Sequence, residues 1–192
     1  MPTMKFSLII ASVLVYTVSA ASTEYGLEAR APTNEECGET KQPLFRLYKR
    51  SENDHFYTNS QRTFDRYVYD MGWTDEGIAG YLLKSHTDLT TPFFRLYHAK
   101  KTDHLYTTSE KERDTAISSS GYVSEGEVGE IYVKQSCGAV PLYRLFNEKT
   151  WDHFYTTDPE ERDGASGYKS EGIAGYILPR FGKDGKKKKK KS

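Results

Sequence analysis

The chain contains three copies of one unit, and this internal repeat limits its possible folds more than any other feature. The segment PLFRLY at 43–48 recurs as PFFRLY at 92–97 and as PLYRLF at 141–146, with an offset of 49 residues each time. The Asp-His segments at 54–58, 103–107 and 152–156 keep the same offset. A single unit of this size cannot bury its apolar face alone, so the three units must pack on one another.

Each copy has aromatic and aliphatic runs that predict short strands at the Pro-led segment, at the Asp-His segment and twice around a Glu-Gly pair. In the second copy, Ser109 with Glu112 matches a capping box and Gly121 is expected to end the helix that begins there. In the third copy, Asp158 before Pro159 is typical of a helix start. The third copy is three residues shorter in this region, which is nearly one helical turn.

We therefore predict an all-β domain with short helical insertions. The expected architecture is β-trefoil-like, with twelve strands and three internal repeats related by pseudo-threefold symmetry. A three-bladed propeller-like array and an irregular α+β repeat are alternatives that the spacing does not separate.

The ends of the chain predict secretion. Lys5 precedes an apolar run at 6–18 and small residues, so 1–20 is expected to be a signal peptide rather than a longer membrane anchor. Residues 21–42 are then a spacer or pro-segment, and 43–178 form one domain with repeats at 43–83, 92–133 and 141–178. The Lys-rich tail at 179–192 is predicted to be disordered, with a tether to an anionic surface as the alternative.

Charge and cysteine content exclude several classes of protein. The whole chain has 27 basic and 27 acidic residues, but 31–182 contains 18 basic and 24 acidic ones, a net charge of −6. Nucleic-acid binding needs a basic face, so no nucleic-acid partner is predicted. Cys37 and Cys137 are expected to form one disulfide after secretion, worth about 4 kcal/mol. They lack the spacing of a zinc site, so neither a metal nor a cofactor is predicted.

An arginine recurs inside each Pro-led apolar strand, at Arg46, Arg95 and Arg144. Burial of an unpaired guanidinium is costly, so each arginine should have a carboxylate partner. The candidates recur too, either as Glu76, Glu125 and Glu171 or as the aspartates of the Asp-His segments. We predict one structural ion pair in each unit.

A histidine beside an aspartate can act as a general base or a metal ligand. Its presence in every repeat favours hydrogen-bonded, structural histidines instead, because buried polar groups are nearly always paired. The sequence has no nucleophile elbow, HExxH motif or phosphate loop, so we predict no enzyme activity. A secreted hydrolase that uses two of the many carboxylates is the remaining catalytic alternative.

The aromatic content, 15 Tyr, 9 Phe and 2 Trp, suits carbohydrate binding, since aromatic faces stack on sugar rings while polar neighbours read the hydroxyls. Most repeated tyrosines are expected in the core, whereas Trp151 is a non-repeated aromatic in a turn. The candidate ligand-binding residues are Asp54, His55, Tyr57, Asp103, His104, Tyr106, Trp151, Asp152, His153 and Tyr155.

The strings PLYRLF, DHFYTT, ERD and EGIAGY resemble a secreted repeat family of unknown function, and the resemblance covers 43–178. Members of that family accompany bacterial cell-wall hydrolases and occur in secreted fungal proteins. The second copy departs from the pattern at Glu127–Ile131. The resemblance implies a glycan or cell-wall polysaccharide as partner, and thus a secreted, non-catalytic, lectin-like protein. The alternative is a protein-binding module, such as an inhibitor of a foreign hydrolase.

Overall fold

A computed structural model describes residues 31–33, 35–38 and 41–180. The predicted signal peptide, most of the predicted spacer and the lysine run of the predicted tail lie outside these residues. Within the described part of the chain, no helix is long and apolar enough to cross a membrane.

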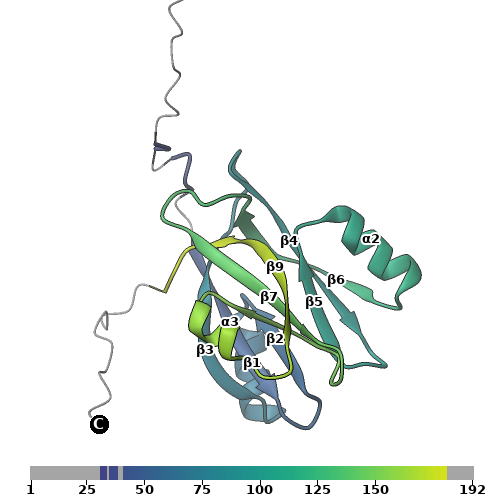
Figure 1. The fold of residues 1–192 in the computed structure, drawn as a ribbon. Helices are drawn as coiled ribbons and strands as arrows, with labels where there is room; N and C mark the ends of the chain where they lie inside the picture. The colour runs from purple at the N-terminus through teal and green to yellow at the C-terminus, as the bar shows by residue number, and fades with distance from the viewer. Residues whose placement is uncertain (1–30, 34, 39–40, 181–192) are drawn as a thin grey trace, which may run out of the picture. The chain divides into compact units, whose positions relative to one another are not determined.

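Strands and helices follow the same order in each repeat (Figure 1). The first repeat contains β1 (Lys41–Lys49), β2 (Asp54–Thr58), α1 (Gln61–Asp65), the π-helix η1 (Arg66–Asp70) and β3 (Thr74–Leu83). The second contains β4 (Thr90–His98), β5 (Asp103–Thr107), α2 (Glu110–Ser119) and β6 (Val123–Tyr132). The third contains β7 (Val140–Asn147), β8 (Asp152–Thr156), α3 (Pro159–Gly164) and β9 (Lys169–Ile177).

The nine strands are joined in one hydrogen-bonded sheet, in which each repeat contributes a three-stranded antiparallel part that we call its sheet. The Pro-led strand lies in the centre of each, in the orders β2-β1-β3, β5-β4-β6 and β8-β7-β9. The register is the same in all three: Leu47 lies opposite Phe56, Leu96 opposite Leu105, and Leu145 opposite Phe154. These three leucines are at most 1 % exposed. Equivalent sequence positions therefore occupy equivalent positions in the sheets.

The expectation of an all-β fold with short helices is confirmed, but the twelve strands of the predicted β-trefoil are wrong, since the described residues form nine. The two strands expected around each Glu-Gly pair are one continuous strand with shifts in register. Gly77, Gly126 and Gly172 have φ between 85° and 101° there. Glycine takes up the extra residue as a β-bulge, so pairing continues where the sequence predicts a break.

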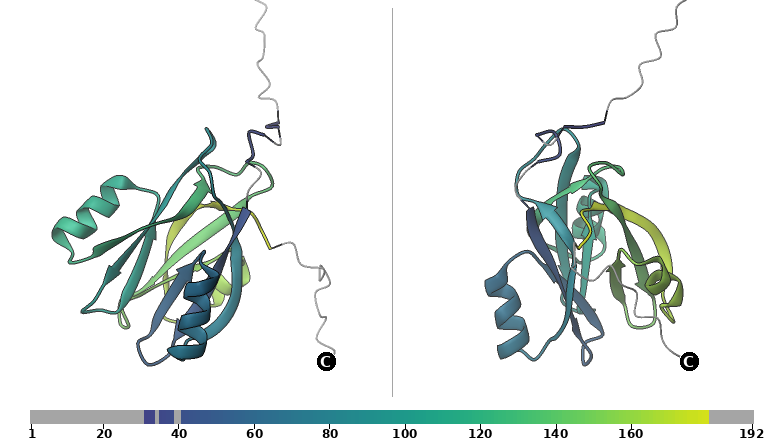
Figure 2. Two further views of the ribbon diagram at one scale, coloured as in Figure 1. Left: turned by 180° about the vertical axis from the view of Figure 1, so that it is seen from behind. Right: turned by 90° about the vertical axis from the view of Figure 1, so that its left-hand side faces the viewer.

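The three sheets meet in two ways. The short strands β2, β5 and β8 contact one another, and β3, β6 and β9 meet near their ends through the pairs Leu83–Glu130, Tyr132–Tyr176 and Tyr81–Leu178. The helices lie outside the strands and apart from one another, with α1 and α3 on opposite sides in the right view of Figure 2.

The predicted helical insertions are confirmed. The expected caps at Ser109 and Asp158 form, although the backbone N–H of Ser109 donates to Thr107 rather than to Glu112 of the predicted capping box, and Ser60 caps α1 as well. The Oγ of Ser60 and of Ser109 accepts the N–H of the residue three positions later, and the Asp158 carboxylate accepts the N–H of Glu160. The shorter third insertion gives α3 six residues where α2 has ten. Gly121, with φ of 81°, follows α2 closely, as predicted.

One hydrophobic cluster draws on all three repeats. It contains the central tyrosines Tyr57, Tyr106 and Tyr155 together with Leu44, Phe93 and Leu142. Separate clusters lie inside the first and second repeats, where α1 and α2 cover the sheets through Phe64 and Ala116. The shared cluster explains why no repeat is expected to be stable alone.

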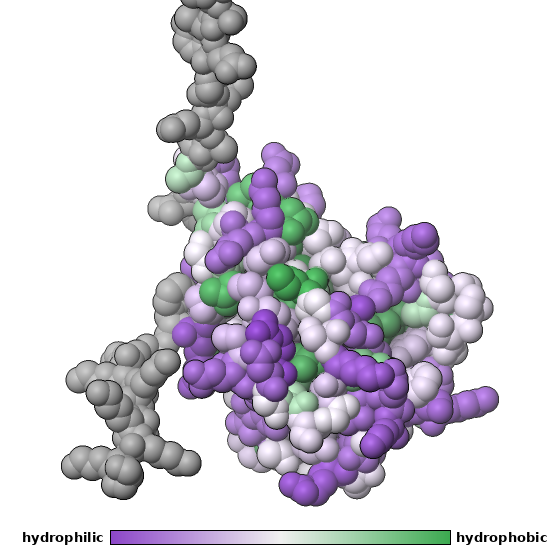
Figure 3. Space-filling view, viewed as in Figure 1, coloured by the Kyte–Doolittle hydropathy of each residue, from purple (hydrophilic) through white to green (hydrophobic). Residues whose placement is uncertain are grey.

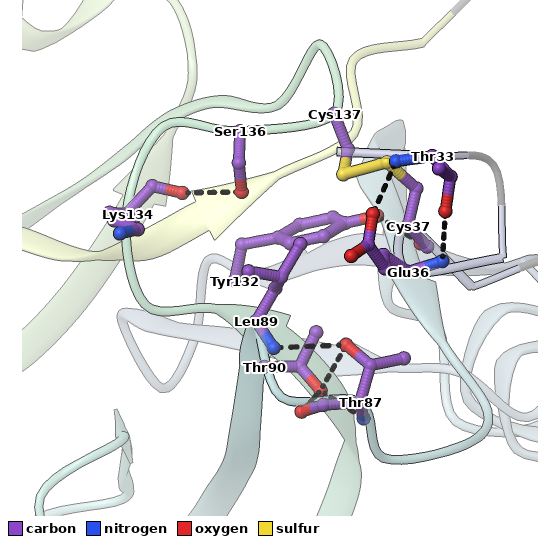
Figure 4. Close-up of a disulfide and its surroundings, with 10 residues drawn as sticks. All are labelled: Thr33, Glu36, Cys37, Thr87, Leu89, Thr90, Tyr132, Lys134, Ser136 and Cys137. Atoms are coloured by element: carbon purple, nitrogen blue, oxygen red, sulfur yellow. Dashed lines mark hydrogen bonds between the residues drawn. A yellow bond between two sulfur atoms is a disulfide. The ribbon is translucent and has the colours of Figure 1, made fainter. Parts of the chain in front are cut away.

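The predicted disulfide between Cys37 and Cys137 is confirmed (Figure 4). The two Cα atoms are 5.6 Å apart, and the bond joins the segment before β1 to the loop before β7. The hydroxyl of Tyr132 donates to the carbonyl of Cys37 beside it. Loop closure over 100 residues restricts the unfolded chain and so stabilises the fold.

Candidate functional site

The three repeats meet at three junctions, which we call junction I (first and second repeats), junction II (second and third) and junction III (third and first). At each, an aspartate of one repeat binds the Nδ1 of the next repeat's histidine at 2.7 Å and also accepts that histidine's backbone N–H. The pairs are Asp54–His104, Asp103–His153 and Asp152–His55. The prediction of hydrogen-bonded histidines is confirmed, with the partner on the neighbouring repeat.

The central tyrosines form a closed ring of hydrogen bonds. Each hydroxyl accepts the backbone N–H of a tyrosine in another repeat and donates to the carbonyl of that same tyrosine, at 2.7–2.8 Å. Tyr57, Tyr106 and Tyr155 are at most 1 % exposed. Their hydroxyls are thus occupied inside the protein.

The three aspartates are also buried, and their carboxylate oxygens lie within 4.8 Å of one another. Burial raises the pKa of Asp54, and the neighbouring Asp152 and Asp103 add to this, while the hydrogen bond from His104 opposes it. Three carboxylates are a donor set that a cation could use. Each of these already accepts a backbone N–H on one oxygen and an imidazole on the other, so their role in this structure is to lock the junctions.

The predicted arginine–carboxylate pairs are confirmed, and the glutamates are the partners. Arg46 lies 3.0 Å from Glu76, Arg95 2.8 Å from Glu125, and Arg144 2.9 Å from Glu171, all through Nε. The same glutamates lie 3.5–3.6 Å from the histidine Nε2 atoms.

Two junctions add a second carboxylate from a helix. Glu112 of α2 makes two hydrogen bonds with Arg144 at 2.9 Å, and Glu161 of α3 makes two with Arg46 at 2.9 and 3.0 Å. Glu112 is the glutamate of the predicted capping box. Its side chain binds the next repeat's arginine, so these helix residues connect neighbouring repeats.

Junction II contains a pocket of about 450 Å³. Its apolar wall includes Leu105, Tyr122, Phe146 and Trp151. Its polar groups include Arg144, Glu112, Glu171, His153 and Lys111. Such a combination of a ring-stacking wall with a few fixed polar groups is typical of a small-molecule or sugar site.

Trp151 has a φ of 59°, a conformation that is unusual for a bulky residue. Asn53 and Thr102 share it at the same turn of the first two repeats, with φ of 49° and 54°. The Nζ of Lys101 lies 4.4 Å from the centre of the Trp151 ring, and Phe146 packs edge-on against it at 5.6 Å. The turn therefore fixes the indole in the pocket wall.

Junction III contains a similar pocket of about 340 Å³. Phe154, Ala165 and Tyr168 line it from the third repeat, and Arg46, His55 and Glu76 from the first. The hydroxyls of Tyr168 and of Tyr122 in junction II each donate to the buried aspartate of their own repeat. Both pockets thus use the same kinds of residues at equivalent positions.

The helix glutamates stay ionised in this setting. Burial acts to raise the pKa of Glu112, but hydrogen bonds from Arg144 and Thr107 outweigh it, and the pKa lies below its usual value. The pKa of Glu161 is lowered in the same way, against burial, by hydrogen bonds from Arg46 and Thr156. Each pocket therefore presents carboxylates that can accept hydrogen bonds from a ligand.

The candidate ligand-binding residues predicted from the sequence fall into two groups in the structure, those that line a pocket and those that lie in the interior. His153 and Trp151 line the pocket of junction II, and His55 lines that of junction III, whereas His104 lies at junction I. The aspartates and central tyrosines are interior groups with internal partners. Sequence reasoning missed Glu112, Glu161, Tyr122, Tyr168 and Phe146. The 49-residue offset, applied to the helices, would have paired Glu112 with Glu161.

The fold and the junction pockets define a β-rich repeat protein with internal salt-bridge networks. A family model described as a domain of unknown function, DUF5648, matches residues 16–178, so the chain belongs to that family. No curated protein and no solved structure matches the chain.

Proposed function

We propose that this is a secreted, non-catalytic carbohydrate-binding protein that takes glycan or cell-wall polysaccharide in the pockets of junctions II and III. The observation that carries the proposal is the pocket of junction II, where Tyr122, Phe146 and Trp151 face fixed polar groups around Arg144. Aromatic rings stack on the apolar face of a sugar, while ionised carboxylates and a guanidinium bind its hydroxyls.

The state of the carboxylates supports binding rather than hydrolysis. A glycoside hydrolase needs one carboxylic acid with a raised pKa to protonate the leaving group. Glu112 and Glu161, the helix carboxylates of the two pockets, have lowered pKa values instead, because their arginine and threonine hydrogen bonds outweigh burial. Burial raises the pKa of Asp54, but this residue lines neither pocket. They suit the role of hydrogen-bond acceptor.

The repetition of the site supports a multivalent mode of binding. We infer that the three sheets form a pseudo-threefold array, nearer to the propeller-like alternative than to a β-trefoil, with its pockets between units. Several weak pockets on one rigid body can retain a polymer that each pocket alone binds weakly. The disulfide suits the oxidising conditions outside the cell.

One face of the molecule gives less support to the alternative of a protein-binding module. On the face shown in Figure 3, hydrophobic residues form small patches separated by hydrophilic ones. Stable protein interfaces usually have an apolar, well-packed centre. Co-purification of a protein partner, together with no glycan binding, would favour this alternative.

The proposal is tested with the mature protein on a glycan array and on chitin, β-glucan and peptidoglycan. We expect retention on at least one of them, and a failure on all of them contradicts the proposal. Trp151→Asn removes the indole and keeps a residue that accepts the positive φ, as Asn53 does. Loss of the stacking ring should weaken retention by about tenfold.

Tyr69→Ala is the matched control, because Tyr69 is 77 % exposed and lines neither junction pocket. Retention of the control should equal that of the wild type. Equal retention of Trp151→Asn and wild type would show that junction II is not a glycan site.

A further inference from the structure

Junction I shares one arginine, one glutamate and one histidine with the other two junctions, but a side chain of the protein fills the space beside them. Arg95, Glu125 and His104 correspond to the groups that line the pockets, and Phe56 corresponds to Leu105 and Phe154. Tyr67 of η1 stacks on Phe56, with ring centres 4.4 Å apart and planes inclined by 16°. Its ring centre also lies 5.2 Å from that of Trp73, the counterpart of Tyr122 and Tyr168.

The repeat offset shows which position makes the difference. Tyr67, Ala116 and Ala165 are separated by 49 residues each. Ala116 lines the pocket of junction II, and Ala165 lines that of junction III. A large ring therefore occupies one junction where the other two have a methyl group and a pocket.

The phenol of Tyr67 lies near the charged groups of junction I. Burial raises its pKa, the charge of Glu125 adds to this, and Arg95 opposes it. Thr63 occupies the position that Glu112 and Glu161 have in the other two helices, so no glutamate of α1 binds Arg95. The NH1 of Arg95 donates instead to the carbonyl of Tyr57, at 3.3 Å. Junction I thus lacks the second carboxylate, and the Tyr67 ring packs against Phe56 and Trp73, the counterparts of residues that line the pockets of the other two junctions.

We infer that Tyr67 is a built-in occupant of junction I, and that the protein therefore offers two ligand sites rather than three. The same geometry indicates how a ligand lies in junctions II and III: a six-membered ring bearing a hydroxyl takes the place of the Tyr67 ring, over Leu105 or Phe154 and beside the Arg–Glu pair. The identity of that ring as a pyranose of a glycan rests on the proposed function, whereas the occupancy by Tyr67 does not.

The occupancy is tested with p-cresol, which is the side chain of tyrosine as a free molecule. Crystals of the full mature protein soaked in p-cresol should show it at junctions II and III in the wild type. Tyr67→Ala should add a third molecule over Phe56, and Ala116→Tyr should abolish the one at junction II. Near-ultraviolet circular dichroism and the melting temperature show whether each variant is folded.

Two results would overturn the inference: p-cresol at junction I of the wild type, or a folded Tyr67→Ala variant in which junction I stays empty at saturating p-cresol. A glycan retained in the array screen is then titrated into the same variants, with expected stoichiometries of two, three and one. If the p-cresol counts hold and no glycan is retained, the proposed function fails while the role of Tyr67 stands.

Discussion

Each central tyrosine hydroxyl binds both the backbone N–H and the backbone carbonyl of a tyrosine in another repeat. One oxygen atom thus makes the two hydrogen bonds that a neighbouring strand would otherwise make. The Tyr155 hydroxyl, for example, accepts a hydrogen bond from the N–H of Tyr106 and donates one to the carbonyl of Tyr106. Buried backbone groups without partners cost about 1–3 kcal/mol each. Each hydroxyl therefore contributes two buried hydrogen bonds between repeats.

Tyr155→Phe tests this role, since it removes one oxygen and leaves the ring. It should lower the free energy of unfolding by about 3 kcal/mol, because two groups of Tyr106 lose their partner inside the protein. Urea unfolding measures the change. Tyr69→Phe, at a residue 77 % exposed, is the control and should change stability by less than about 0.5 kcal/mol. A loss no larger than that of the control would contradict the role.

The sequence identified the repeated Asp, His and Arg residues, but it could not assign all their partners. The aspartate that holds His55 is Asp152, 97 residues away, rather than the adjacent Asp54. Chain neighbours and spatial neighbours differ here because each junction joins two repeats. Trp151 was identified because it breaks the repeat, and Tyr67 was missed although it breaks the repeat in the same way.

The helices differ in how they connect the repeats. The third helical position carries glutamate in α2 and α3, where it reaches the arginine of the next repeat, and Thr63 in α1, where it does not. Arg144 therefore has carboxylates from two repeats, whereas Arg95 has only Glu125 as an ion-pair partner among the described residues.

Replacement of these arginines by methionine should show the difference. Arg144→Met removes the arginine partner of two carboxylates and should cost about 2 kcal/mol. Arg95→Met removes that of one and should cost about 1 kcal/mol. Both costs are reduced by the partial exposure of the glutamates and by their remaining histidine or threonine neighbours. Chemical unfolding compares them with Lys149→Met, an exposed control. Equal losses for the two arginine variants would show that the helix glutamate adds nothing.

The helices and most strands were predictable from the sequence, because caps, glycine stops and apolar runs are local signals. The bulged strands were not. Whether Glu76-Gly77 ends a strand or bends it depends on continued pairing with β1, which is a long-range contact. The expected count of twelve strands is wrong here, because the Glu-Gly bulge of each repeat bends one strand instead of ending it in the part of the chain that the structure describes.

The whole molecule should unfold readily in alkali. Burial raises the pKa values of Tyr57, Tyr106 and Tyr155 well above the usual value, so the folded state keeps them neutral. Their stabilising effect is fully present below about pH 10 and is lost as pH rises, since the unfolded chain then ionises first. For three tyrosines the loss is about 4 kcal/mol per pH unit.

Melting temperatures recorded from pH 8 upward, together with tyrosinate absorbance, measure this effect. We expect the absorbance of the buried tyrosines to rise only as the near-ultraviolet circular dichroism signal is lost. Full ionisation of all tyrosines in a protein that keeps this signal would contradict the prediction.

The Asp–His contacts run in one direction around the three repeats, and this closed order limits how many repeats such a protein can have. The first repeat's aspartate serves the second repeat, the second serves the third, and the third returns to the first. A chain shortened to the first two units would leave His55 without its aspartate and Asp103 without its histidine. A fourth unit would find all three aspartates and all three histidines already paired. A change at one junction, such as Tyr67 in place of the alanine found in the other two repeats, leaves this closed order intact, whereas a change in the number of units breaks it.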